Sequence, residues 1–311
     1  MIRIRPCSGS AAVLSLTSVL SCADAAADDV SLPPLPLGNT SFMDGIVLPG
    51  MLFELPVQHY RSNDAANAQG HAVPGRQRVR STAVLPHLAY ISTRKFLGAY
   101  YGAEILLPLV HLDLEIDGGP DGDRTRQGDL VVSPMLLQWE PVSLFGRPYW
   151  QRLNLVITAP TGDYDRDASI NVGSNLWIVS PHYAFTWELT DRLEVSGRLH
   201  YAWSSRNDDP ASRLQAGDIQ PGTAIHSNFS VSYALSDAWR VGLAGYQLRQ
   251  TSADRIDGQR QSDSKERVLG LGPGVMYRQG KQSFFANYYI EQGARNRSEG
   301  SQLTLRYLLP F

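Results

Sequence analysis

Polar side chains at every second position of several apolar stretches are the residues of this sequence that could do chemistry. Successive side chains of a β-strand point to opposite faces, so residues at this spacing share one face of a sheet. That face is either the lining of a conduit or pocket, or a set of groups that pair with one another and fill a narrow interior. The residues that we expect to contact a solute from this face are Arg152, Asn154, His182, Glu194, Arg198, His200 and Asn228.

The adjacent residues His226 and Ser227 suggest a hydrolase that uses a serine nucleophile. In a strand these two side chains point to opposite faces, so the histidine cannot activate the serine. A His-x-Ser spacing would align the two groups, and it is absent here. We therefore predict that the protein is not an enzyme.

The sequence also contains no set of residues at the spacing of a metal site and no cofactor-binding motif. The histidines are scattered with no pair at ligand spacing, and the four aspartates Asp113, Asp117, Asp121 and Asp123 are expected to be solvated loop residues. Both cysteines, Cys7 and Cys22, lie in the leader described below, which excludes thiolate sites in the mature chain. The glycine cluster at 270–274 has no following helix and indicates close packing rather than a phosphate loop. We expect no metal and no cofactor.

The elements that must position the polar face are β-strands. Short connections alternate with long polar ones, which is typical of an up-and-down barrel with short periplasmic turns and long external loops. The predicted fold is an all-β, up-and-down antiparallel transmembrane β-barrel of about twelve strands with both ends in the periplasm. The expected strands are 51–60, 79–91, 99–113, 129–139, 150–160, 177–187, 193–203, 223–235, 239–249, 267–277, 282–291 and 301–311.

Strand length and aromatic placement favour a barrel that spans a membrane. One face of residues 177–187 is apolar and has Trp177 and Trp187 at its ends, which are roughly 33 Å apart along a strand. With the tilt usual in barrels this projects to roughly 25 Å, the height of an outer-membrane apolar band between its aromatic girdles. A net charge of −2 gives no reason to expect a nucleic-acid partner.

The last eleven residues, 301–311, alternate strictly and end on an aromatic residue. Tyr307 and Phe311 lie on the apolar face, as in closing strands that the barrel assembly machinery recognises. An ordinary edge strand of a soluble sandwich is the alternative. We predict that Tyr307 and Phe311 form an assembly signal.

The N-terminus resembles an export signal, and the residues after it form a separate segment. Residues 1–27 contain a basic start, a short apolar core and small residues at the expected cleavage site. A leucine before Ser21 is atypical of a lipoprotein box, so lipidation of Cys22 is disfavoured. The predicted domains are thus a signal peptide (1–27), an N-terminal extended segment (28–50) and the barrel (51–311).

Residues 28–50 are rich in proline and too apolar for a solvated tail. The segment lies either in the periplasm or in the lumen, and the lumen would bury its apolar surface. Asp44 could then pair with Arg152 or Arg198. We predict that the segment partly occludes the barrel and that Phe42, Met43 and Asp44 belong to the solute path.

Several separated stretches resemble the outer-membrane proteins of the meta-pathway of phenol degradation family. They include GNTSFMDGIVLPGMLFELPVQHY near the start, TAPTGDYDRDASINVGSNLWIVSPHYAFTW in the middle, and RVLGLGPGVMY with FFANYY near the end. A more distant likeness is to the long-chain fatty-acid channels, in which an N-terminal segment plugs the lumen. The resemblance implies a transporter in the outer membrane for small hydrophobic or aromatic compounds.

The expected partners are outer-membrane lipid and lipopolysaccharide, the barrel assembly machinery and a small hydrophobic solute. A structural or adhesin-like barrel that acts through its long external loops, without transport, is the alternative function.

Overall fold

The computed structural model describes residues 30–311. The predicted signal peptide, its cleavage site and Cys22 lie outside the described residues. Among residues 30–311, no helix has the length and apolar composition needed to cross a membrane.

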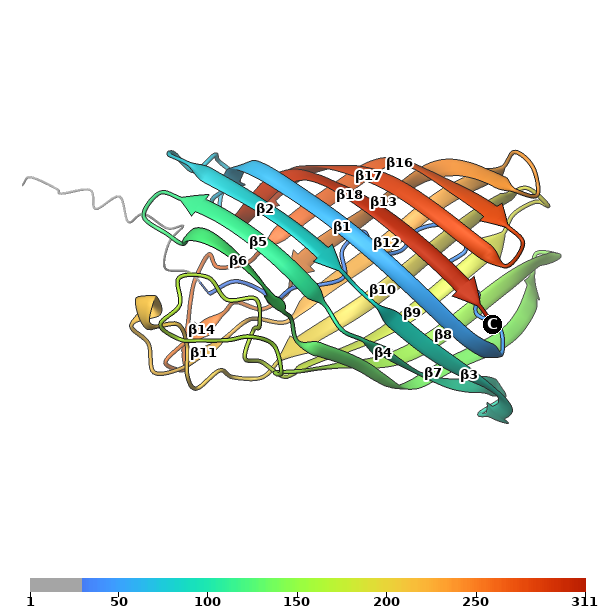
Figure 1. Cartoon of the computed structure of the whole chain (residues 1–311), viewed down its shortest axis with the longest axis horizontal. Helices are drawn as coiled ribbons and strands as arrows, with labels where there is room; N and C mark the ends of the chain where they lie inside the picture. Colours follow the sequence, from blue (N-terminus) through green and yellow to red (C-terminus); the bar gives the residue numbers. More distant parts are fainter. Residues whose placement is uncertain (1–29) are drawn as a thin grey trace, which may run out of the picture.

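The described chain forms a closed antiparallel β-barrel (Figure 1), as the alternating connections predicted. The barrel has twelve strands when a strand divided by a short break is counted once. Closure comes from pairing between the last strand and the first, for example Leu55 with Tyr307. The strands are β1 (Gly50–Ala66), β2 (Gln77–Val84), β3 (His87–Phe96), β4 (Ala99–Leu106), β5 (Leu109–Ile116), β6 (Asp121–Gln127), β7 (Leu130–Leu144), β8 (Arg147–Ala159), β9 (Ile178–Glu188), β10 (Leu193–Ser204), β11 (Ile219–Gln220), β12 (Ala224–Ala234), β13 (Trp239–Gln250), β14 (Arg255–Ile256), β15 (Gln259–Arg260), β16 (Arg267–Gln279), β17 (Gln282–Arg295) and β18 (Arg297–Pro310), with one 3-10 turn, η1 (Ser212–Leu214).

Three of the twelve barrel strands are each interrupted once, and these breaks were not predicted from the sequence. β2 and β3 are separated at residues 85–86, β4 and β5 at 107–108, and β6 and β7 at 128–129. Pro86 and Pro108 lie at the first two breaks, where a residue without an amide hydrogen cannot donate to the ladder. Beyond the third break, β6 pairs with β5 alone, and irregular residues 160–177 cover its free edge, with the Asp163 amide donating to the Gln127 carbonyl (3.0 Å).

The two ends of the barrel differ as expected, but two predicted loops are wrong. Tight turns at 97–98, 145–146 and 280–281 mark one end, here called the turn end. At the other end, the loop end, residues 114–128 were predicted as a loop but form most of the β5–β6 hairpin, and 292–300 continue β17 and β18 with only Asn296 between them. Polar residues can form these extensions because, beyond the apolar band, water solvates both faces of a strand.

The two faces of the wall separate apolar from polar residues. On β10, Leu199, Tyr201 and Trp203 are exposed on the outside, whereas Glu194 and His200 on the opposite face of the same strand are buried inside. On β18, Leu303 and Leu305 face outward, and Phe311 is 60% exposed beside the first strand, where its main chain exchanges two hydrogen bonds with Met51 (3.0 and 2.9 Å).

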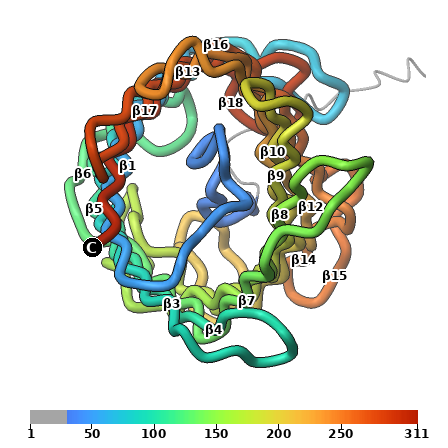
Figure 2. Tube along the Cα trace, turned by 90° about the vertical axis from the view of Figure 1, so that its right-hand side faces the viewer, coloured from blue at the N-terminus to red at the C-terminus, as the bar shows by residue number. Residues whose placement is uncertain are grey.

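The chain before β1 runs inside the barrel (Figure 2). Its residues 30–49 have no regular secondary structure, and most of them are buried or half-buried. Val30 lies at the loop end, where neighbouring Leu32 donates to Glu266, and Gly50 begins β1 at the turn end. We call residues 30–49 the luminal segment.

Candidate functional site in the lumen

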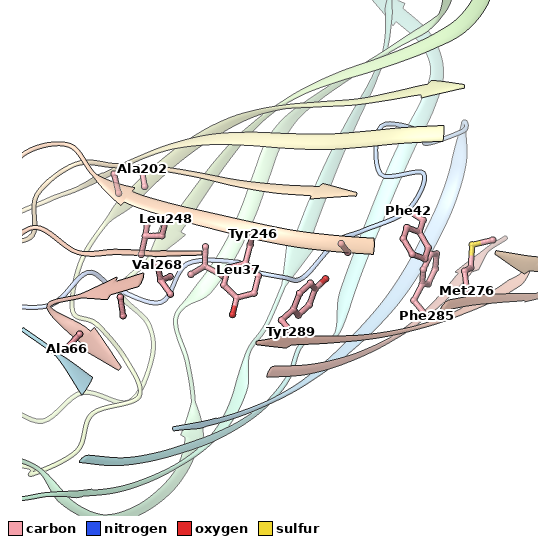
Figure 3. Close-up of a cluster of buried hydrophobic side chains, with 13 residues drawn as sticks. Leu37, Phe42, Ala66, Ala202, Tyr246, Leu248, Val268, Met276, Phe285 and Tyr289 are labelled. Atoms are coloured by element: carbon pink, nitrogen blue, oxygen red, sulfur yellow. The ribbon is translucent and has the colours of Figure 1, made fainter. Parts of the chain in front are cut away.

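Phe42 anchors the luminal segment to one side of the wall (Figure 3). Its ring is 1% exposed and packs in a cluster with Met276 of β16 and Phe285 of β17. Gly274 makes room for it, because a Cβ there would lie 2.9 Å from the Phe42 ring and 2.1 Å from Asn287. This explains one part of the 270–274 glycine cluster as a packing site.

Wall side chains satisfy the main-chain groups of the luminal segment, which forms no ladder of its own. The Gly38 amide donates to Asn228 Oδ1 (2.8 Å), the Gly45 amide to Thr186 Oγ1 (2.9 Å) and the Val47 amide to Gln138 Oε1 (3.2 Å). Gly45 lies so close to β9 that a Cβ would be 2.3 Å from its main chain. A wall that provides these partners holds the segment in one path.

Asp44 is the charged anchor of the luminal segment. Its carboxylate is buried and accepts two hydrogen bonds from the Arg198 guanidinium, at 2.8 Å from Nε and 2.5 Å from Nη2. Arg152 is on the other side, with Nη2 3.8 Å from Asp44 Oδ1. The two arginines flank Ala184 on neighbouring strands, because each pairs with that residue in the ladder.

A belt of paired charges continues around the wall from this anchor. Glu54 of β1 forms ion pairs with Arg306 of β18 (3.1 Å) and with His87 Nδ1 (3.0 Å). His87 Nε2 lies 3.4 Å from Glu104 of β4. Both imidazole nitrogens thus face carboxylates, which matches the doubly protonated ring because each nitrogen then carries a hydrogen to donate.

Three histidines stack across β9, β10 and β12, which the sequence analysis did not foresee. The ring centroids of His182 and His200 are 4.4 Å apart, and those of His200 and His226 are 4.2 Å apart. The strand register pairs the three residues directly. Within residues 30–311 no group of three or more His, Cys, Asp or Glu side chains is arranged to hold a metal ion.

The lumen contains one large cavity beside the luminal segment. It has a volume of about 960 Å³. Apolar side chains from both the wall and the segment line most of it, and the charged belt crosses it. A second cavity of about 660 Å³ lies nearer the loop end, and Pro34, Leu35 and Leu112 are among the residues that line both.

The predicted solute-path residues fall into two groups in the structure. Those that line the larger cavity are Phe42, Met43, Asp44, Arg152, His182, Arg198 and His200. The others lie behind its surface: Asn154 donates to Glu104 (2.9 Å), Glu194 accepts from Ser196 (2.6 Å), and Asn228 holds the luminal segment. Glu54, His87 and Arg306 line the cavity as well and were not among the predicted residues.

The sequence matches the profile of a protein family described as "Putative MetA-pathway of phenol degradation" over residues 62–307. The chain belongs to this family. The family resemblance drawn from the sequence motifs is therefore confirmed, and the family and barrel together place the protein in the bacterial outer membrane. No curated protein matches the chain at a significant level.

Solved structures of outer-membrane barrels share the fold. The COG4313 outer membrane channel from Pseudomonas putida F1 is 20% identical, covers 87% of this chain and 98% of its own, and superposes with a TM-score of 0.75. Weaker similarity extends to a Pseudomonas aeruginosa FadL homologue, which is 10% identical, covers 92% of this chain and 100% of its own, and has a TM-score of 0.42. The CymD monoaromatic hydrocarbon channel is 9% identical, covers 85% of this chain and 91% of its own, and has a TM-score of 0.45.

Proposed function

We propose that this family member is an outer-membrane channel for the uptake of small hydrophobic or aromatic compounds. The observation that carries the proposal is the larger cavity, whose lining is mostly apolar although it lies inside the polar face of the barrel. Concave, mostly apolar cavities with a few convergent polar groups are typical of small-molecule sites. If the lumen served only to pack the interior of the barrel, its polar groups would pair with one another and no cavity of this volume would remain.

The two cavities give the solute a route from the loop end toward the turn end. They share lining residues, so a compound that enters among the loops first meets the smaller cavity and then the larger one. Predicted topology puts the loop end outside the cell. The luminal segment borders both cavities, and we propose that it limits passage to small compounds.

Flux through proteoliposomes tests this function. The barrel is reconstituted and the uptake of phenol is compared with that of a similarly sized charged solute, aspartate. We expect phenol uptake well above that of protein-free liposomes and little transport of aspartate. Phenol uptake no faster than that of protein-free liposomes would favour the alternative, a structural or adhesin-like barrel that acts through its loops.

A further inference from the structure

Arg152 is a buried cation with few partners. Its side chain is 5% exposed, its ion pair with Asp44 is long at 3.8 Å, and its Nε has no hydrogen-bond partner in the part of the chain that the structure describes. Asp44 is instead bound closely by Arg198. A guanidinium with only a long ion pair in a low-dielectric site is costly, and the usual partner that relieves the cost is a carboxylate or another anion.

His182 is close to Arg152 and is also without partners. His182 pairs in the ladder with Asn154 and is one diagonal step from Arg152, a distance that long side chains can bridge. Both of its ring nitrogens are buried and lack a hydrogen-bond partner within residues 30–311. Arg152 and His182 both line the larger cavity. Their unpaired nitrogens lie beneath its surface, so a bound molecule pairs with them only after a small turn of the two side chains.

The net charge of the belt would be neutralised by one bound anion. With His87 protonated between its two carboxylates, the belt carries one more positive than negative charge. The negative groups are Asp44, Glu54 and Glu104, and the positive groups are His87, Arg152, Arg198 and Arg306.

On the side of the loop end, the wall beyond this pair combines apolar side chains with the hydroxyls of Ser133, Thr158 and Ser180, which also line the cavity. Val156 and Ile178 lie closer to the loop end on β8 and β9, and Val131 lies beside them on β7. All three line the cavity. A solute that arrives from the loops would therefore place its apolar body against these residues and its polar head toward Arg152 and His182.

We propose that the larger cavity binds small amphiphilic monocarboxylates, with the carboxylate on Arg152 and His182 and the apolar body against Val131, Val156 and Ile178. This inference rests on the proposed channel function and adds, within its substrates, a preference for apolar compounds that carry one negative charge. A dicarboxylate fits less well, because its second charge would lie against the apolar wall.

Calorimetric titration of the purified full-length barrel with benzoate and with benzamide, its neutral analogue of the same shape, tests the inference. We expect benzoate to bind about tenfold or more tightly than benzamide, since a charge-assisted hydrogen bond in a buried site is worth at least that factor. Arg152→Gln should reduce the preference to about one. Arg147→Gln, which removes a half-buried arginine at the start of β8 that pairs with Asp191, should leave the preference unchanged.

Equal affinity of the wild-type barrel for benzoate and benzamide would overturn the inference, whatever the variants do. Protein-dependent flux, which is the rate above that of protein-free liposomes, is measured with the same two solutes and separates this failure from failure of the proposed function. Benzamide that crosses as fast as benzoate contradicts carboxylate recognition and leaves the channel intact. Benzoate that binds tightly while neither solute crosses contradicts the channel and leaves the binding site standing.

Discussion

Deletion of residues 39–48 should open the barrel without unfolding it. The deletion removes Phe42 from its cluster, Asp44 from Arg198, and the amides of Gly45 and Val47 from their wall acceptors. The wall strands keep all their ladder pairing, because none of these residues belongs to a strand. We therefore expect normal assembly and a higher conductance.

The structure also predicts that Asp44→Asn opens the lumen less than the deletion does, because the luminal segment keeps its other anchors. Breaking a buried ion pair from one side costs about 3–5 kcal/mol, which would raise the population of a displaced segment about 100-fold or more. The remaining anchors oppose displacement: burial of Phe42 contributes about 1.5–3 kcal/mol, and each side-chain hydrogen bond to the segment main chain contributes about 1 kcal/mol. These anchors include the bonds to Leu32, Gly38, Gly45 and Val47.

Single-channel recording in planar bilayers distinguishes these states. The wild type should show low conductance, Asp44→Asn more frequent open events, and the deletion a stable high conductance. The heat-dependent shift of the folded barrel on a gel serves as the control for assembly. If the deleted barrel assembles normally and conducts like the wild type, the luminal segment does not obstruct the lumen and its assigned role is wrong.

Three further predictions concern assembly, topology and pH. Removal of Phe311 should lower the amount of heat-modifiable barrel in the outer membrane, because the exposed ring that ends the closing strand is lost, and unchanged amounts would contradict its role as a signal. Tags near Asp208 and Asp257 should be accessible on intact cells and a tag near Asp237 should not; the reverse pattern would invert the orientation. Burial raises the pKa of the Glu266 carboxyl to about 7, against the opposing effect of its ion pair. The folded state thus holds a proton that the unfolded chain releases above its ordinary pKa, so thermal stability should fall as pH rises from about 4.5 through 7. In Glu266→Gln this pH dependence should shrink, and an identical profile would refute the assignment.

Alternation of side chains was enough to predict the barrel wall. The apolar rows of β10 and β18 appear directly in the sequence, and so does the matching polar row. The turns could be located for the same reason, because short and long connections alternate. The β17 and β18 extensions could not be predicted, since polar residues form strands there only because neighbouring strands provide ladder partners.

The site was predictable only in part. Pairing of Asp44 with an arginine followed from the cost of a buried charge, and the structure places Asp44 against Arg198. The stack of His182, His200 and His226 depends on the register between three strands, which side-chain alternation does not specify. His87 was missed for a related reason: it follows the break at Pro86 and is brought between two carboxylates by pairing of β3 with β1 and β4.

Filling the larger cavity tests most directly whether the solute passes through it. Val156 lines the cavity, so Val156→Trp should fill part of it, whereas Val195→Trp places the same side chain on the outer face of β10. Phenol flux into proteoliposomes, above the rate of protein-free liposomes, is measured for both variants and for the wild type, at equal amounts of folded barrel. The account predicts a large loss of flux for Val156→Trp and wild-type flux for Val195→Trp. Full phenol flux through Val156→Trp would show that the solute does not pass through this cavity.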